Sequence, residues 1–254
     1  MTPPPILIPQ EAPPAFLGVS RSATGRRWRD RLDPRGAAQA LAIAQRHQLP
    51  EMLARVLAGR GVDLDAVTDF LDPTIRRLMP EPFTVTQMEA ATTRIAGAVT
   101  RGERVAIFGD YDVDGATSSA LLAWHLRHCG LDPLIHIPDR IFEGYGPNVE
   151  AVRALKTKGA TLLITVDCGT TSIEALAEGE RLGVSGVVID HHQCGDELPA
   201  VDALVNPNRP DDLSGLGHLA AVGLVFVTLV ALNRELRNRG FWNELRPEPD
   251  LLGM

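Results

Sequence analysis

The sequence predicts an α/β protein with a mostly parallel sheet and flanking helices, preceded by a helical N-terminal segment. Continuous β-branched apolar runs bounded by Gly or Asp are typical of strands buried on both faces, and here they alternate with segments of helical character. We expect strands near residues 104–109, 133–137, 161–166, 186–190 and 201–205. We expect helices near residues 116–129, 147–158, 172–182 and 216–238.

Three regions are expected along the chain. Residues 1–35 are rich in Pro and Arg and predict an irregular arm, whereas residues 36–101 predict helices and residues 102–254 predict the sheet domain. Thr86-Gln-Met-Glu89 has the pattern of a capping box. It predicts a helix that begins there and ends near Gly102.

Composition limits the classes of function. A chain of 254 residues with 44% hydrophobic residues can bury a sizeable core. Its formal net charge of −7 does not indicate nucleic-acid binding, for which a basic domain is expected. One basic cluster, from Arg21 to Arg31 around Trp28, either contacts a phosphate backbone or is a solvated arm.

The cysteine count and the lengths of the apolar runs indicate in which cellular compartment the protein is expected. Three cysteines are too few for a disulfide framework in a chain of this length, so we expect reduced thiols. No basic region followed by an apolar core is present at the N-terminus. The longest apolar run, Leu219 to Leu232, is shorter than the ~20 residues that a spanning helix needs. We therefore expect a cytoplasmic protein without a membrane segment.

Acidic and imidazole side chains follow several of the predicted strands. They are Asp110, Asp112 and Asp114 after the first strand, Asp167 after the third, and Asp190, His191 and His192 after the fourth. The carboxyl ends of parallel strands meet at one edge of a sheet, where ligands gather near a topological switch point. Carboxylates clustered there repel one another unless they are protonated or bound to a cation. The sequence therefore predicts a polynuclear site whose oxygen and imidazole donors favour Mn²⁺, with Mg²⁺ as the alternative.

Other sites built from the same residues fit less well. A calcium-binding EF-hand loop that starts at Asp110 needs Glu at its twelfth position, which is Leu121, and a helix before it. A phosphatase of the haloacid dehalogenase type needs Asp-x-Asp-x-Thr/Val, and no register of the acidic segment supplies it. Zinc held by His191, His192 and Cys194 lacks a second thiolate at chelating spacing.

The same segments carry a family resemblance. Gly109-Asp-Tyr-Asp-Val-Asp-Gly115, Val166-Asp-Cys-Gly169 and Asp190-His-His192 resemble motifs one to three of the DHH phosphoesterases. The first is most similar to the motif of the bacterial single-strand-specific 5′→3′ exonucleases of that family. Four further stretches agree as well, Arg55 to Gly61, Phe70-Leu-Asp-Pro73, Pro138-Asp-Arg140 and Glu143-Gly-Tyr-Gly146. The similarity therefore runs from about residue 43 to the C-terminus.

The resemblance implies a metal-dependent phosphodiesterase that degrades single-stranded DNA in repair and recombination, with Mn²⁺ or Mg²⁺ at a two-metal site. It implies four metal ligands, Asp112, Asp114, Asp167 and His191. Of these, Asp167 can bridge two ions. His192 is implied to contact the scissile phosphate, so that these five residues are the catalytic set. Asp110 and Asp190 could each orient a ligand instead.

Two residues on the loop after the second strand are candidates for substrate binding. The Arg140 guanidinium can hold a phosphate with two hydrogen bonds, and the Tyr145 ring can stack on a base or donate to phosphate. The alternative is that Gly144-Tyr-Gly146 is a turn with a packing Tyr. The backbone amides after Gly115 could also hold an anion at a helix N-terminus.

The resemblance leaves several points open. Related phosphoesterases act on short oligoribonucleotides, cyclic dinucleotides or pyrophosphate, and an inactive nucleic-acid-binding fragment is the non-enzymatic alternative. The family has a fourth motif with a further metal-binding Asp, shortly after a stretch like Pro247 to Leu252, yet this chain stops at Met254. We therefore expect the N-terminal part of a longer enzyme, inactive by itself. The family's partners would include a single-strand-binding protein and a helicase.

Overall fold

The computed structural model describes residues 14–253, so the first 13 residues of the predicted irregular arm lie outside the described part. The chain divides into two compact units, Met1–Met79 and Pro80–Met254. The first unit begins with a 3-10 turn, η1 (Phe16–Gly18). It continues with the helices α1 (Pro34–His47), α2 (Glu51–Gly59), α3 (Val67–Leu71) and α4 (Ile75–Leu78). Helices α1 and α2 pack through a small apolar core that includes Ile43, Ala54 and Leu57.

The second unit is built on one parallel sheet. Its strands are β1 (Val105–Gly109), β2 (Leu134–His136), β3 (Leu162–Val166), β4 (Ser185–Ile189) and β5 (Ala203–Val205). After a 3-10 turn, η2 (Pro82–Thr84), its helices are α5 (Met88–Arg101), α6 (Val113–His128), α7 (Val149–Thr157), α8 (Ile173–Arg181) and α9 (Ala221–Asn238). The predicted fold class, an α/β protein with a helical N-terminal segment, is confirmed.

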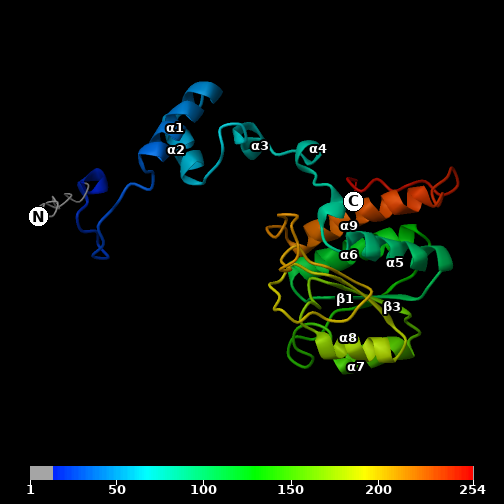
Figure 1. Cartoon of the computed structure of the whole chain (residues 1–254). Helices are drawn as coiled ribbons and strands as arrows, with labels where there is room; N and C mark the ends of the chain where they lie inside the picture. Colours follow the sequence, from blue (N-terminus) through cyan, green and yellow to red (C-terminus); the bar gives the residue numbers. More distant parts are fainter. Residues whose placement is uncertain (1–13, 254) are drawn as a thin grey trace, which may run out of the picture. The chain divides into compact units, whose positions relative to one another are not determined.

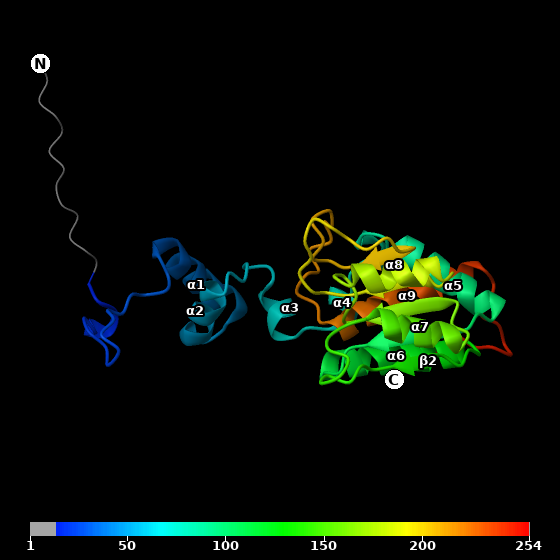
Figure 2. The ribbon, with the colours of Figure 1, turned by 90° about the horizontal axis from the view of Figure 1, so that it is seen from below.

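The strand order creates a switch point beside the predicted site. The order is β2-β1-β3-β4-β5, with every neighbouring pair parallel. Helices α5, α6 and α9 cover one face of the sheet and α7 and α8 cover the other (Figures 1 and 2). The chain leaves β1 for α6 and leaves β3 for α8, so the two connections diverge to opposite faces. Such divergence opens a crevice at the carboxyl ends of the two strands.

The register brings the ends of the strands to one level. Gly109 of β1 pairs with Val166 of β3, which in turn pairs with Ile189 of β4. These three residues are followed by Asp110, Asp167 and Asp190, respectively. Because β1 and β3 are buried along their whole length, they have no freedom to slip, and the three carboxyl groups leave the sheet side by side.

The start of α5 differs from its prediction. No capping box forms, because the backbone N–H of Thr86 donates instead to Asp212, at 2.7 Å. Gln87 is the N-cap residue, in the left-handed conformation and without a side-chain cap bond. A partner far away in the chain therefore replaces the local interaction. Helix α5, which the sequence groups with the N-terminal segment, packs against α9 and β5 within the second unit.

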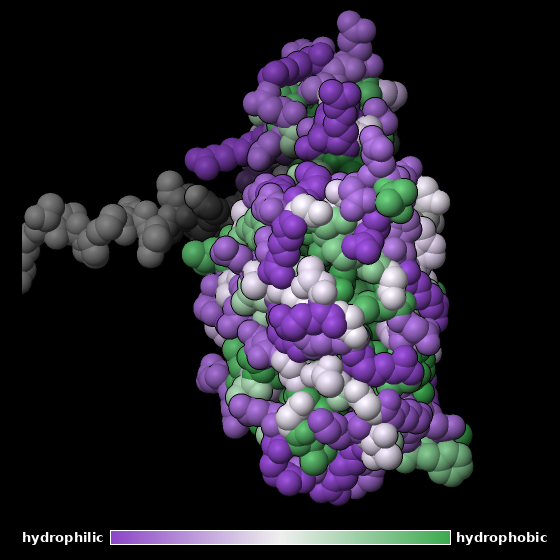
Figure 3. Space-filling view, turned by 90° about the vertical axis from the view of Figure 1, so that its right-hand side faces the viewer, coloured by the Kyte–Doolittle hydropathy of each residue, from purple (hydrophilic) through white to green (hydrophobic). Residues whose placement is uncertain are grey.

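None of the helices within residues 14–253 is both long and apolar enough to cross a bilayer. Hydrophilic and hydrophobic residues are intermixed on the face shown in Figure 3.

Because β3 is buried and β2 lies at the edge of the sheet, we expect truncation of an isoleucine to lower the free energy of unfolding much more in β3 than in β2. Ile164 in β3 is fully buried, whereas Ile135 in the edge strand β2 is 45% exposed. Ile164→Ala should lower the free energy of unfolding by about 2–5 kcal/mol, because it leaves a cavity that the packed layers cannot fill. Ile135→Ala should lower it by less than about 1 kcal/mol. Urea unfolding of the two variants checks this, and equal losses would contradict the assigned sheet order.

Candidate metal centre

The structure brings the predicted acids and histidines together at the carboxyl edge of the sheet. One cluster consists of Asp167, His191 and His192, and a second consists of Asp110, Asp112 and Asp167. Within each cluster the potential ligand atoms lie within 4.8 Å of one another. Asp167 belongs to both clusters, which is the arrangement that a carboxylate bridging two cations requires.

Asp167 is the most constrained residue of the centre. Its backbone has a positive φ of 60°, and its side chain is almost fully buried. Oδ1 lies 3.2 Å from His191 Nε2, but not in hydrogen-bonding geometry, and it has no hydrogen-bond partner. Burial, together with the neighbouring carboxylates of Asp114 and Asp112, raises the pKa of Asp167 to about 8. The ionised form of Asp167 therefore needs a cation.

Asp110 is a second buried carboxyl group with an unpartnered oxygen. Its Oδ1 has no hydrogen bond, and its side chain is buried against the end of β1. Burial and the adjacent Asp112 raise the pKa of Asp110. Two unpartnered buried oxygens within one donor cluster, on Asp110 and Asp167, are the donor set expected for a hard divalent cation. The structure therefore groups Asp110 with the donor atoms themselves.

Asp112 joins the centre to a helix. It is the N-cap residue of α6, and its Oδ1 accepts hydrogen bonds from Asp114 N at 2.9 Å and Gly115 N at 3.0 Å. The bond from Gly115 and that from Asp114 lower the pKa of Asp112, so its carboxylate is held ionised. Gly115 has no substitute here, because a Cβ on it would lie 2.5 Å from the carbonyl oxygen of Asp110. These two amides precede those for which an anion was predicted, and the first amide after Gly115, that of Ala116, donates to the backbone oxygen of Asp112.

Asp114 has a different set of contacts from the other acids. Its two oxygens accept hydrogen bonds from Ala221 N at 2.7 Å and Val222 N at 2.8 Å, which caps the N-terminus of α9. The same carboxylate lies 3.7 Å from His191 Nε2. Among the described residues, Asp114 thus borders the centre but belongs to neither donor cluster. Its role as a ligand stays a prediction.

His191 is held in the tautomer that a metal ligand needs. Its Nδ1 lies 3.0 Å from the carbonyl oxygen of Leu219, which can only accept, so Nδ1 carries the proton. Nε2 then presents its lone pair towards Asp167. A lone pair facing a carboxylate oxygen is favourable only with a proton or a cation between them.

His192, a member of the first cluster, forms an ion pair with Asp190, whose side chain is buried whereas that of His192 is half-exposed. Asp190 Oδ1 lies 2.8 Å from His192 Nδ1 and also accepts from His191 N, while Oδ2 accepts from Thr170 N. Although burial opposes it, hydrogen bonding to His192 and Thr170 lowers the pKa of Asp190 to about 2. The hydrogen bond to Asp190 raises the pKa of His192. Asp190 therefore orients His192 and leaves its Nε2–H for a bound anion.

Two asparagines that the sequence reasoning missed hold this loop in place. Asn206 donates to the carbonyl oxygen of His192 and to Thr170, and Asn208 donates to the carbonyl oxygen of His191. Both follow β5, so the rule that led to the acids, polar residues just past a strand, could have found them too.

The substrate candidates lie on the loop after β2. The Arg140 guanidinium lies over the ring of Tyr111, with 5.2 Å between Cζ and the ring centroid. The Tyr145 hydroxyl donates to the backbone oxygen of Asp167 at 3.1 Å and lies 3.1 Å from His192 Nδ1. Tyr145 is thus more than a turn residue, because it connects its loop to the centre.

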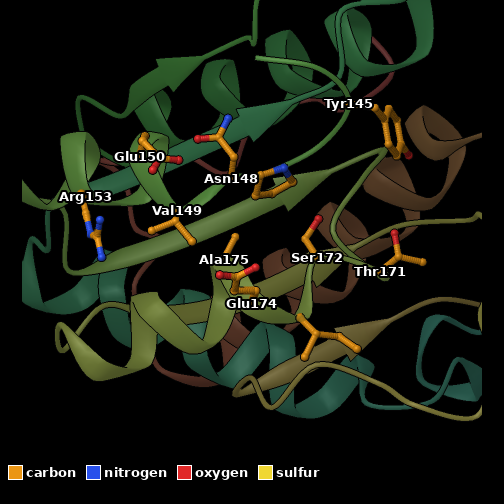
Figure 4. Close-up of a pocket in the computed structure, with 11 residues that line it drawn as sticks. Tyr145, Asn148, Val149, Glu150, Arg153, Thr171, Ser172, Glu174 and Ala175 are labelled. Carbon is orange, nitrogen blue, oxygen red and sulfur yellow. The ribbon is translucent and has the colours of Figure 1, made fainter. Parts of the chain in front are cut away.

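A cavity of about 600 Å³ opens next to Tyr145. Asn148, at the start of α7, and Thr171 and Ser172, before α8, supply polar groups to its wall (Figure 4). The cavity is large enough for a nucleotide-sized group, and its wall also carries the charged side chains of Glu150, Arg153 and Glu174.

The thiols do not contribute to the centre. Cys168 is fully buried, and its Sγ lies against the backbone oxygens of Phe108 and Val166. Burial raises the pKa of Cys194, and its Sγ donates to the carbonyl oxygen of Asn208. Within residues 14–253 no candidate ligand cluster contains a cysteine, which favours oxygen-seeking cations over zinc.

Comparisons with known proteins agree with this geometry. The family described as the DHH family, N-terminal domain, matches residues 104–249. The chain is 35% identical over 195 residues to the single-stranded-DNA-specific exonuclease RecJ of Bacillus subtilis, covering 77% of this chain and 25% of the relative. It is 35% identical over 198 residues to RecJ of Escherichia coli, covering 78% and 34%. The chain thus spans about a quarter to a third of these relatives.

Solved structures show the same likeness. A crystal structure of exonuclease RecJ bound to manganese is 34% identical, with a TM-score of 0.55, and the match covers 60% of this chain and 38% of that one. RecJ of Thermus thermophilus in complex with Mn²⁺ is 28% identical, with a TM-score of 0.64, and the match covers 81% of this chain and 28% of that one.

The pKa of Asp167 predicts a pH-dependent gain in stability when its charge is removed. Between about pH 4 and pH 8 the unfolded chain ionises this carboxyl group while the folded chain keeps it protonated, so rising pH lowers the free energy of unfolding. Without metal, Asp167→Asn should therefore raise the melting temperature, and the gain should grow from pH 5 to pH 8 and level off above.

Asp190→Asn is the matched control, and we expect it to lower the stability that Asp167→Asn raises. The ionised Asp190 stabilises the fold above about pH 4, and that contribution is lost only as the pH falls towards 2. This variant should lose stability throughout pH 5–8. Thermal melts in EDTA compare the two, and a constant effect of Asp167→Asn with pH would contradict the assigned proton.

Proposed function

This chain belongs to the DHH family, and we propose that its acidic centre hydrolyses phosphodiester bonds of single-stranded DNA with divalent metal ions. The observation that carries the proposal is the pair of donor clusters sharing Asp167, whose buried Oδ1 has no hydrogen bond. Two relatives of this chain are named single-stranded-DNA-specific exonucleases, and a related structure contains manganese. A 5′→3′ direction and a role in DNA repair and recombination are part of the proposal.

The residues present fit a pair of Mn²⁺ or Mg²⁺ ions. Asp110 and Asp112 would hold one ion and His191 the other, with the Asp167 carboxylate between them. Asp114 remains a proposed ligand that also caps α9. When bound, such ions supply the Lewis acidity that makes a water molecule nucleophilic at neutral pH and offsets the charge of the phosphate.

The remaining side chains are placed to bind and orient a phosphodiester. His192, held by Asp190 and with a raised pKa, donates its Nε2–H to a non-bridging phosphate oxygen. Tyr145 fixes the loop that carries Arg140 against the centre. Arg140 then supplies a second positive charge to the strand. No side chain needs to act as a nucleophile in this scheme.

Replacing Asp112 separates catalysis from folding. Asn is as good an N-cap residue as Asp, so Asp112→Asn should keep helix α6 and the fold. In a chain extended to the length of its relatives, hydrolysis of a single-stranded oligonucleotide should fall by more than about 100-fold, because the loss of a direct ligand exceeds the effect of losing a group that only orients one. Mn²⁺ affinity, measured by calorimetry, should fall in parallel.

Asp132→Asn is the control for this charge change. Its side chain is 81% exposed and precedes β2, at the opposite edge of the sheet. Metal affinity and rate should not change. Full activity of Asp112→Asn would contradict the metal assignment, and preferential cleavage of oligoribonucleotides, cyclic dinucleotides or pyrophosphate would contradict the proposed substrate.

We expect substitution of Arg140 to lower the affinity for DNA without lowering the affinity for metal. Arg140→Ala should weaken binding of single-stranded DNA by about 1.5–3 kcal/mol, because it removes a charge-assisted hydrogen bond to phosphate. Arg104→Ala removes the same charge at the start of β1, at the far edge of the sheet, and should have little effect. Fluorescence anisotropy measures DNA affinity and calorimetry measures Mn²⁺ affinity. If Arg140→Ala binds DNA as tightly as the parent, Arg140 has no role in the substrate site.

A further inference from the structure

The first unit carries a basic surface that the metal centre does not use. A cavity of about 390 Å³ is lined by Arg29, Arg31, Arg55 and Arg60 together with Phe16. We propose that this surface, called here the arginine surface, binds the phosphate backbone of a single-stranded nucleic acid. The inference extends the proposed function, on which its choice of ligand rests, to a second binding site on the chain.

The segment that supplies these residues is folded against the helices. Trp28 exchanges backbone hydrogen bonds with the turn before it, accepting from Phe16 N and donating to Val19 O, each at 3.1 Å. Asp30 forms an ion pair with Arg55 of α2 at 2.8 Å, and Leu32 packs against the core of α1 and α2. Residues 16–32, within the described part of the arm, are therefore held against α1 and α2 at several points.

Three of the guanidinium groups are available for an anion. Among the residues that the structure describes, Arg29, Arg31 and Arg60 form no ion pair, and all three are exposed. Other arginines of the same unit, such as Arg46 and Arg77, are paired with Asp side chains. The one acid at the cavity, Asp30, is already neutralised by Arg55. The arginine surface therefore has an unbalanced positive charge.

The charge of the chain is divided between the two units. Residues 1–79 contain 11 basic and 8 acidic residues, a formal +3, whereas residues 80–254 contain 14 basic and 24 acidic residues, a formal −10. The second unit by itself repels a polyanion at long range. A basic surface elsewhere on the same chain supplies the attraction that captures one.

Aromatic side chains favour a single-stranded nucleic acid over an acidic protein. Phe16 lines the cavity and is 37% exposed, and Trp28 beside it is 46% exposed. Proteins that bind single strands combine a basic groove with exposed rings on which bases stack. A purely electrostatic partner would gain nothing from these rings.

A charge-matched pair of variants tests the arginine surface. The test variant is Arg29→Gln/Arg31→Gln/Arg60→Gln, and the control is Arg46→Gln/Arg76→Gln/Arg77→Gln, which removes the same charge from the same unit. Binding of a fluorescein-labelled oligodeoxythymidine is followed by anisotropy in EDTA at several salt concentrations. Circular dichroism confirms the helices of both variants.

The test variant should bind about tenfold or more weakly at low salt. Its slope of log affinity against log salt should also be smaller by about 2, since each lost phosphate contact removes about 0.7 from a single-strand slope. The control should bind within about twofold of the parent. An abasic strand of the same length should bind the parent several-fold more weakly, because it cannot stack.

Other outcomes overturn the inference. Equal losses of affinity in both variants would show an effect of net charge alone. Unchanged binding by the test variant would show that the arginine surface does not bind the strand, and so would a parent protein that binds no strand. Equal affinity for the abasic strand would point to a general polyanion such as an acidic protein. Because the assay needs neither metal nor hydrolysis, arginine-dependent binding without nuclease activity in a chain extended to the length of its relatives would contradict the proposed function and leave this inference standing.

Discussion

The burial of Asp110 and Asp167 after β1 and β3, with repulsion of Asp167 by the carboxylates of Asp114 and Asp112, is the constraint on which the rest of the second unit depends. The parallel register brings Asp110 and Asp167 to one level, and the burial of both strands prevents either from moving away. Each keeps one buried oxygen without a hydrogen bond, which costs free energy in any folded protein. The raised pKa of Asp167 shows how the isolated chain relieves the repulsion, by holding a proton where a cation would bind.

Much of the surrounding structure holds these groups in place. Asp112 caps α6 and Asp114 caps α9, so two of the three helices that cover one face of the sheet begin at the centre itself. The Leu219 carbonyl oxygen sets the tautomer of His191. Asn206 and Asn208 fix the backbone of the two histidines. A substitution at the centre therefore affects helix ends as well as donor atoms, which is why Asn, a good cap, is the informative replacement at Asp112.

The two units carry formal charges of opposite sign, positive in residues 1–79 and negative in residues 80–254. A phosphodiesterase centre must be acidic to hold cations, yet its substrate is a polyanion, and the two demands conflict on one surface. The cations offset part of the acidic charge when they are bound. The arginine surface of the first unit would supply attraction independently of metal, from residues that the sheet domain does not contain.

The sequence by itself determined the fold class, the strands and the edge at which the chemistry lies, because buried parallel strands have an apolar pattern that survives without knowledge of their neighbours. It also singled out Asp112, Asp167 and His191. Tertiary structure decided what depends on partners distant in the chain. It placed Asp110 among the donor atoms and turned Asp114 towards α9, and it replaced the expected capping box at Thr86 with a bond to Asp212. Local sequence cannot encode these choices, because each depends on which backbone N–H or carboxylate lies opposite after the layers have packed.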